Sequence, residues 1–121
     1  LKPSDSMSQV LVLDTIGHLA SAYYYGNVAL VGGAFGKGLH NILEPIAFGV
    51  PVIFGPHTQK YPEAQLSINN QIAIQVNTTE EFVNALEGLM KNPPQQACLE
   101  FIKSNKGASE IVVKELLNLK Q

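Results

Sequence analysis

Four short apolar runs recur along the chain. They are residues 9–13 (QVLVL), 28–31 (VALV), 51–54 (PVIF) and 72–76 (IAIQV). Short runs rich in Val, Ile and Leu, with turn-forming residues beside them, are typical of buried β-strands. The run at 51–54 is wholly apolar, which predicts a central strand covered on both faces of a parallel sheet.

Helical patterns separate these runs and continue after the last one. Gly49 is expected to end the second helix, and Asn77-Thr78-Thr79 to cap the fourth. Short connections between alternating strands and helices predict an α/β fold, a Rossmann-like parallel sheet with helices on both faces, as a single domain over 1–121. The predicted helices span 16–25, 42–50, 62–68, 79–90, 95–104 and 108–119.

Two loops, residues 32–39 and 55–61, leave the carboxyl ends of predicted strands. Ligands of parallel α/β sheets bind outside these strand ends. We therefore expect both loops to line one crevice.

The first loop is rich in glycine, with Gly32, Gly33, Gly36 and Gly38 close together. Glycine permits positive φ and lets a ligand approach the backbone. The loop leads into a helix whose free N–H groups and dipole favour an anion, and Lys37 adds a positive charge. The expected guest is a phosphate or carboxylate; the alternative is a glycine-rich turn that binds nothing.

This loop matches neither common nucleotide fingerprint. A P-loop has four residues between its first glycine and Gly-Lys, and then Ser or Thr. Counted from Gly32 the spacing is one residue short, and Gly38 replaces the hydroxyl. The dinucleotide pattern fails at Asn41, and the expected acidic residue after the next strand is missing. Neither an NTPase nor a dehydrogenase is expected.

Polar side chains follow the glycines. Pro45 requires the regular helix to start after Asn41, which places Glu44 in its first turn. The Glu44 carboxylate would suit a neutral diol, such as ribose hydroxyls; the other interpretation is a capping box with Asn41, and both can hold. His40 is expected to contact an anion or to cap the loop, and His57 in the second loop is a further candidate. The tyrosines at 23–25 are predicted to pack rather than to bind a ligand.

Composition narrows the class of function. The chain has 121 residues, of which 45% are hydrophobic and 15% charged, and a net charge of −2, so a basic surface for nucleic acid is not expected. The single cysteine, Cys98, excludes an internal disulfide and is expected to fill the core.

No apolar stretch approaches the roughly 20 residues of a membrane span. We find no catalytic triad, metal-ligand cluster or carboxylate pair, so the sequence indicates binding without a metal or cofactor.

Four motifs resemble the 3-deoxy-D-manno-octulosonic acid (Kdo) transferases of bacterial lipopolysaccharide synthesis. They are Asp14-Thr15-x-Gly17-x-Leu19, VALVGG at 28–33, HN-x-LEP at 40–45 and AFG-x-PV-x-FGPH at 47–57. The resemblance implies a two-domain type B (GT-B) glycosyltransferase, of which this chain is the second, donor-binding domain. It also implies a CMP-Kdo donor, a lipid A precursor as acceptor, and inverting transfer without a metal at the cytoplasmic face of the inner membrane.

The same resemblance assigns the donor site. The glycine loop with His40 and Asn41 would hold the donor phosphate and carboxylate, and Glu44 would contact the ribose. The acceptor site and general base would lie in a missing amino-terminal domain, so this fragment alone is expected to be soluble and inactive. The expected substrate-binding residues are Gly32, Gly33, Gly36, Lys37, Gly38, His40, Asn41, Glu44 and His57.

Three positions depart from the family pattern: His18, Leu39 and Ile42 stand where an acidic residue, a glycine and a proline are usual. Two other functions stay open. One is a donor domain for a different nucleotide sugar, such as a UDP-hexose. The other is a non-catalytic α/β module that captures a phosphorylated ligand.

Overall fold

The computed structural model describes residues 23, 25–33, 41–105, 110 and 113. The expected strand at 9–13, nearly all of the helices at 16–25 and 108–119, and residues 34–40 lie outside this part of the chain. The described elements are β1 (Ala29–Leu30), α2 (Leu43–Ala47), β2 (Val52–Phe54), α3 (Pro62–Asn69), β3 (Ala73–Gln75), α4 (Thr79–Lys91) and α5 (Gln95–Ser104).

The described strands form one parallel sheet in the order β1-β2-β3. The central strand β2 is buried along its whole length, as its apolar sequence predicts. The backbone ladder extends past β1, because the N–H groups of Ala29 and Val31 donate to the carbonyls of Pro51 and Ile53 at 2.9 Å each. The expected parallel α/β fold is confirmed.

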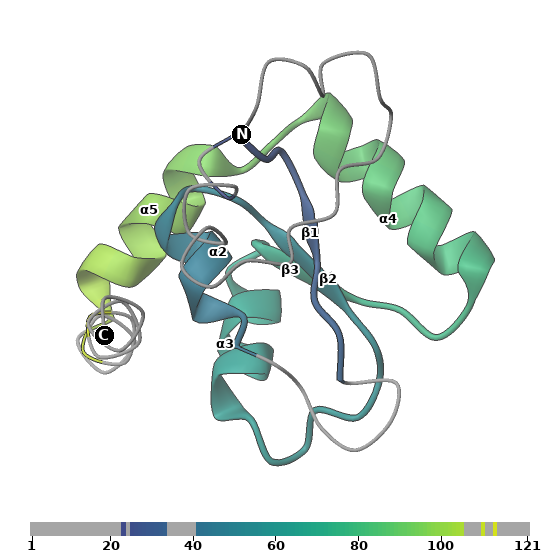
Figure 1. Ribbon diagram of the computed structural model, residues 1–121, viewed down its shortest axis with the longest axis horizontal. Helices are drawn as coiled ribbons and strands as arrows, with labels where there is room; N and C mark the ends of the chain where they lie inside the picture. The colour runs from purple at the N-terminus through teal and green to yellow at the C-terminus, as the bar shows by residue number, and fades with distance from the viewer. Residues whose placement is uncertain (1–22, 24, 34–40, 106–109, 111–112, 114–121) are drawn as a thin grey trace, which may run out of the picture.

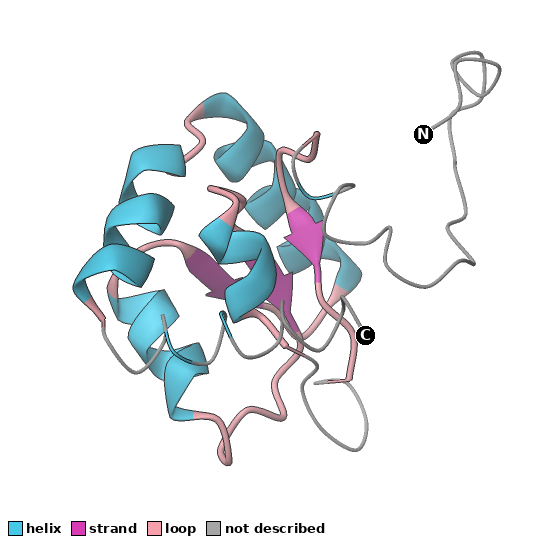
Figure 2. Cartoon of the chain, turned by 60° about the vertical axis from the view of Figure 1, so that its left-hand side comes forward, coloured by secondary structure: helices cyan, strands magenta, loops and turns pink. Residues whose placement is uncertain are grey.

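Helices cover both faces of this sheet, as predicted. In Figure 1, α4 lies on one side of the strands and α2, α3 and α5 lie on the other; Figure 2 shows the strands between helices. Successive side chains of a strand point to opposite faces. Accordingly, Val52 and Phe54 belong to one hydrophobic cluster, while Ile53 between them joins a second cluster with Ala85 and Leu89 of α4.

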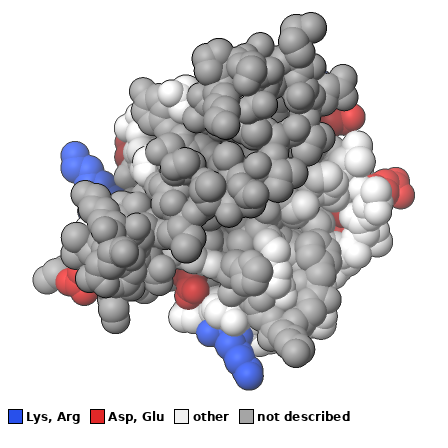
Figure 3. Space-filling model, viewed as in Figure 1, with Lys and Arg blue, Asp and Glu red and all other residues white. Residues whose placement is uncertain are grey.

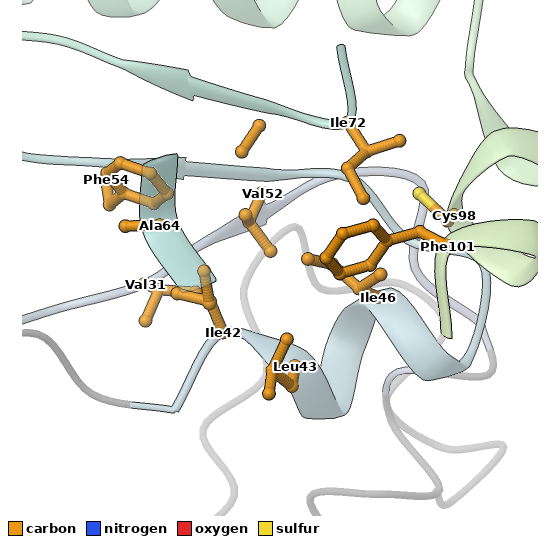
Figure 4. Packing of buried hydrophobic residues seen from close by; sticks show 11 residues of the cluster. Val31, Ile42, Leu43, Ile46, Val52, Phe54, Ala64, Ile72, Cys98 and Phe101 are labelled. Atoms are coloured by element: carbon orange, nitrogen blue, oxygen red, sulfur yellow. The ribbon is translucent and has the colours of Figure 1, made fainter. Parts of the chain in front are cut away.

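The larger hydrophobic cluster contains the residues through which α2 packs against the sheet and α5. Ile42, Leu43 and Ile46 are at most 1% exposed, and Cys98 and Phe101 of α5 belong to the same cluster. Figure 4 shows Ile46, Ile72 and Phe101 directed toward one another beneath the sheet. The expected core position of Cys98 is confirmed.

Helix α2 is shorter than predicted, since it ends at Ala47 rather than near residue 50. Gly49 then adopts a φ of +80°, its N–H donates to the carbonyl of Ile46, and the N–H of Val50 donates to that of Pro45. This pair of bonds is a Schellman motif, in which glycine supplies the left-handed residue after the helix. Gly49 therefore ends the helix as expected, but through a turn that occupies residues 48–50.

The expected cap of α4 is present. The Oγ1 atom of Thr78 accepts a hydrogen bond from the N–H of Glu81 at 3.1 Å, and the Glu81 carboxylate accepts one from the N–H of Asn77 at 3.2 Å. This reciprocal arrangement satisfies N–H groups that a helix start leaves without intrahelical partners.

The described charges do not gather into one patch on the face drawn in Figure 3, where acidic and basic side chains are scattered. Within the described residues, no helix combines the length and apolar character that crossing a membrane requires.

Candidate functional site

A cavity of about 490 Å³ opens beside β1. This volume lies in the range of small-molecule sites. It reaches Gly32 at the carboxyl end of β1 and the start of α2, where Asn41 and Glu44 contribute to its wall. Its described lining residues are Tyr23, Gly26, Val28, Ala29, Leu30, Val31, Gly32, Asn41, Glu44 and Val50.

The two polar atoms of the Asn41 side chain differ in their hydrogen bonding at the start of α2. Its Oδ1 atom accepts a hydrogen bond from the N–H of Leu43 at 2.9 Å, which caps the helix. Its Nδ2 atom is buried and has no hydrogen-bond partner among the described residues. Buried donors without partners are rare in native proteins. An amide donor without a described partner therefore belongs to a residue that lines the cavity.

Glu44 is only 7% exposed, although it is a carboxylate on a short helix near the surface. It lies on the side of α2 away from the core residues Ile42 and Ile46, as the helical spacing predicts, and it lines the cavity. A carboxylate accepts hydrogen bonds from neutral hydroxyls without opposing charge. The arrangement supports contact with a diol, while Asn41 caps the helix at the same time.

Tyr23 is a cavity residue that sequence reasoning assigned to packing alone. Its ring does pack, with its centroid 6.3 Å from that of Phe48, but the residue also lines the cavity with Glu44. Burial, and in second place the charge of Glu44, raises the pKa of Tyr23 above its usual value. The clue available in the sequence is the position of this tyrosine just before β1, on the same edge as the glycine loop.

The remaining expected ligand contacts fall into three groups. Gly32 lines the cavity, and Gly33 adopts a φ of +95°, a conformation that favours glycine. His57 is exposed in the loop after β2 and is not part of the described lining of the cavity. Gly36, Lys37, Gly38 and His40 lie outside the described residues.

The expectation that loops 32–39 and 55–61 share one crevice stays a prediction, because residues 34–39 lie outside the described residues. The described lining of the cavity includes Gly32 and no residue of 55–61. The second loop instead approaches β3, where the Thr58 hydroxyl donates to Oε1 of Gln75 at 3.1 Å.

The described residues contain no group of three potential metal-ligating side chains. The cavity combines a carboxylate, an amide donor and a phenol with apolar backbone-rich walls. Such a set can bind and orient a sugar, but it includes no nucleophile activated by a neighbouring base. The site fits recognition of a polar ligand.

Curated relatives of the chain are Kdo transferases. The 3-deoxy-D-manno-octulosonic acid transferase of Haemophilus influenzae is 36% identical over 109 residues, which cover 84% of this chain and 26% of the relative. The transferase of the same name from Aquifex aeolicus is 37% identical over 83 residues, covering 67% of this chain and 24% of the relative.

A bifunctional glycosyltransferase/methyltransferase of Fusobacterium nucleatum is also related, at 34% identity over 118 residues, or 94% of this chain and 18% of the relative. The chain therefore spans about a quarter or less of the length of these relatives. No family model matches the chain.

A solved structure resembles the fold as well as the sequence. It is the C-terminal CMP-Kdo binding domain of WaaA from Acinetobacter baumannii, with a TM-score of 0.56 and 26% identity, covering 93% of this chain and 53% of that one. The motifs, the parallel α/β fold and these relatives agree. The chain belongs to the Kdo transferase family and corresponds to its carboxyl-terminal domain.

Proposed function

We propose that this chain binds the donor CMP-Kdo and forms the donor half of an enzyme that transfers Kdo to the lipid A precursor. The observation that carries the proposal is the cavity beside β1, which brings the buried Glu44 carboxylate and the Asn41 amide together next to Gly32. Residues 1–121 form one donor-binding domain, and the rest of the enzyme supplies the acceptor site and the general base. The transfer is inverting, uses no metal and takes place at the cytoplasmic face of the inner membrane.

In this proposal each part of the site recognises one part of the donor. The glycines, Lys37 and His40 hold the phosphate and the Kdo carboxylate, and the Asn41 amide, whose Nδ2 atom has no partner in the described chain, donates to one of their oxygen atoms. Glu44 accepts hydrogen bonds from the ribose hydroxyls. His57 contacts the donor from the second loop.

The first experiment titrates the chain with CMP, UDP and inorganic phosphate by calorimetry. The proposal expects CMP to bind most tightly. Preference for UDP would instead indicate a donor domain for a UDP-sugar, and equal affinity for phosphate and CMP would indicate a general anion module. A chain that binds none of the three ligands would contradict a donor site in this chain.

The second experiment tests the diol contact with Glu44→Gln, which keeps the shape of the side chain and removes its charge. Hydrogen bonds to charged groups contribute about 1.5–3 kcal/mol, so CMP affinity should fall roughly 10- to 100-fold. Binding of 2′,3′-dideoxy-CMP, which lacks both hydroxyls, should not change. The matched control is Glu87→Gln on the exposed face of α4. Equal affinity of wild type and Glu44→Gln for CMP would exclude the ribose contact.

A further inference from the structure

β1 has the sequence of a central strand but lies at one side of the described sheet. Residues 28–31 (VALV) are wholly apolar, like β2, which is buried along its whole length. Leu30 is nevertheless 57% exposed, and Val28 is only partly buried. Strands that are apolar on both faces belong in the interior of parallel sheets, where both faces are covered. Within the described residues, β1 therefore lacks part of the cover that its sequence fits.

The backbone of β1 is paired along one edge in the part of the chain that the structure describes. The N–H groups of Ala29 and Val31 donate to carbonyls beside or within β2, and the strand order β1-β2-β3 places no described strand on the other side. Backbone groups of successive residues point to alternate edges, so the N–H and C=O groups of Leu30 point away from β2. Native proteins often protect such a free edge with charged residues or proline, and residues 27–33 contain neither.

The exposed Leu30 side chain lies on the face of the sheet that α4 covers. Val28 packs against the cluster beneath α4, and side chains two residues apart in a strand share a face. Leu30 also lines a cavity of about 230 Å³ with Val76 and with Phe82 of α4. On the opposite face, Val31 is buried in the cluster that contains the core residues of α2. One face of β1 is thus covered, and the other is open beside α4.

The handedness of the connections indicates what can cover this open face. The chain passes from β1 through α2 to β2 and from β2 through α3 to β3, and both helices lie on one face of the sheet. Crossovers between parallel strands are almost always right-handed, so strands added in the opposite direction from β1 place their helices on the other face. That other face is the one that α4 covers and on which Leu30 is exposed.

The solved relative has additional chain of the kind required. The C-terminal CMP-Kdo binding domain of WaaA is matched over 53% of its chain by 93% of this one. Almost half of that chain therefore has no counterpart here, whereas a strand with its crossover helix and the next strand takes only about 30 residues.

We propose that the rest of the enzyme adds a parallel strand to the free edge of β1 and packs the crossover helix of that strand on Leu30. The inference goes beyond the proposed function and rests on it only for the existence of the rest of the enzyme. Strands on the two sides of β1 would then carry their helices on opposite faces. Ligands of α/β sheets bind at the carboxyl ends of strands where the winding changes in this way, and Gly32 of the candidate site lies at that end of β1.

Amide hydrogen exchange at single residues, compared between the 121-residue chain and the whole enzyme, tests the added strand. In the chain alone, the N–H of Leu30 should exchange at least about tenfold faster than those of Ala29 and Val31, because only the latter two are bonded across to β2. In the whole enzyme the N–H of Leu30 should become slow as well. Fast exchange of Leu30 in the whole enzyme would overturn the inference. Slow exchange in the chain alone would also overturn it, because residues 1–121 or a second copy would then close the edge.

Two lysine substitutions in the whole enzyme test the cover of the side chain, whether or not the chain folds alone. Leu30→Lys would place a charge beneath the added helix and should lower the midpoint of thermal unfolding by about 5 °C or more. The matched control is Leu66→Lys, because Leu66 is 42% exposed on α3, which lies on the other face of the sheet. Its midpoint should change by less than about 2 °C. Equal shifts for the two variants would overturn the inference.

Titration of the wild-type chain with CMP separates this inference from the proposed function. Neither exchange nor unfolding requires a nucleotide. Fast exchange of Leu30 in an enzyme whose isolated chain binds CMP would overturn the added strand alone. A chain that does not bind CMP, but whose Leu30 N–H becomes slow in the whole enzyme, would overturn the donor site alone.

Discussion

In the proposed site, the Asn41 side chain would serve folding and binding at the same time. Its oxygen caps α2 through Leu43, which fixes the orientation of the amide and turns the nitrogen toward a buried position. Because the two atoms act separately, a substitution can remove one contribution and keep the other.

Asn41→Ser should separate stability from binding. Serine caps helices about as well as asparagine, so the free energy of unfolding should change by less than about 0.5 kcal/mol. Its short hydroxyl cannot replace the Nδ2 donor, and CMP affinity should fall about three- to tenfold. Thermal unfolding and calorimetry provide the two measurements. Asn41→Ala is the control that loses both, and unchanged CMP affinity in Asn41→Ser would contradict the ligand contact.

Cys98 gives a pH-dependent test of the core. Burial raises the pKa of its thiol from 9.0 to about 12. Above pH 9 the unfolded chain loses this proton while the folded chain keeps it, so this group alone should lower the free energy of unfolding by about 1.4 kcal/mol per pH unit. Below pH 9 the group should have no effect.

Denaturant unfolding between pH 8 and 10.5 measures this slope. In Cys98→Ala the contribution of the thiol disappears, and the remaining slope should be shallower than that of wild type. Identical slopes in the two proteins would mean that the thiol ionises as readily in the folded chain as in the unfolded chain.

At the residue scale, the sequence predicted on which face of a helix a side chain lies better than it predicted how deeply that side chain is buried. The helical spacing correctly placed Glu44 on the side of α2 away from the core, but it did not reveal that the carboxylate is buried. Burial depends on how distant parts of the chain pack, which helical spacing alone does not show. The second role of Tyr23 was missed for the same reason, because its packing partner Phe48 lies 25 residues away in the sequence.

At the scale of elements, α2 is notable because it has only five residues. So short a helix is not stable by itself, and tertiary contacts must maintain it. The Schellman turn at Gly49 supplies its end, and the first residue of α5, Gln95, lies directly against that turn.

Gly49→Ala and Gly88→Ala should change the free energy of unfolding in opposite directions. At Gly49 the φ of +80° is strained for alanine, and the new Cβ would lie 2.8 Å from Cγ of Gln95. We expect a loss of about 1–2 kcal/mol, since the left-handed penalty dominates and Gln95 can partly move. At Gly88 in α4 a Cβ meets nothing within 4 Å, so alanine should stabilise by about 0.5–1 kcal/mol.

The two variants are matched by chemistry and differ in backbone conformation. Thermal unfolding should shift to a lower midpoint for Gly49→Ala and to a higher one for Gly88→Ala. A fall of equal size in both would indicate that alanine is unfavourable for a reason other than backbone conformation.

Element boundaries followed the strength of local signals. The start of α4 at Thr79 was predicted correctly, because Thr78 and Glu81 form a cap that is visible in the sequence, and its end was predicted one residue early. The end of α2 was predicted about three residues too late. The turn at 48–50 contains apolar residues like those of the helix, so the sequence pattern does not change where the helix ends. β2 was predicted well since burial on both faces requires an uninterrupted apolar run.

On the scale of the whole molecule, each face of the described sheet has a hydrophobic cluster of its own, packed under its own helices. We therefore expect residues 1–121 to fold without the rest of the enzyme. The chain nevertheless spans only 26% of the transferase from Haemophilus influenzae. In the proposed enzyme, folding of the donor domain and catalysis would therefore require different lengths of chain.

The isolated chain should bind CMP but transfer no Kdo. Chemistry in the proposed enzyme needs an acceptor site and a general base from outside these residues, and binding a donor alone does not lower the barrier to transfer. Incubation with CMP-Kdo and the lipid A precursor, followed by mass spectrometry, measures the product. A full-length relative is the positive control, and product formation by the isolated chain would show that the proposed division of roles is wrong.

Because α5 packs on α2, a shortened gene can encode all residues of the proposed site and still lack a helix that supports it. The glycine loop, Asn41 and Glu44 are all encoded before residue 45, and β2 ends at Phe54. A reading frame cut at residue 94 would keep every motif of the donor site but would lose Cys98 and Phe101, which cover α2. In the proposed site, the shortest donor module that keeps α2 packed would therefore include α5, a helix that carries none of the motifs.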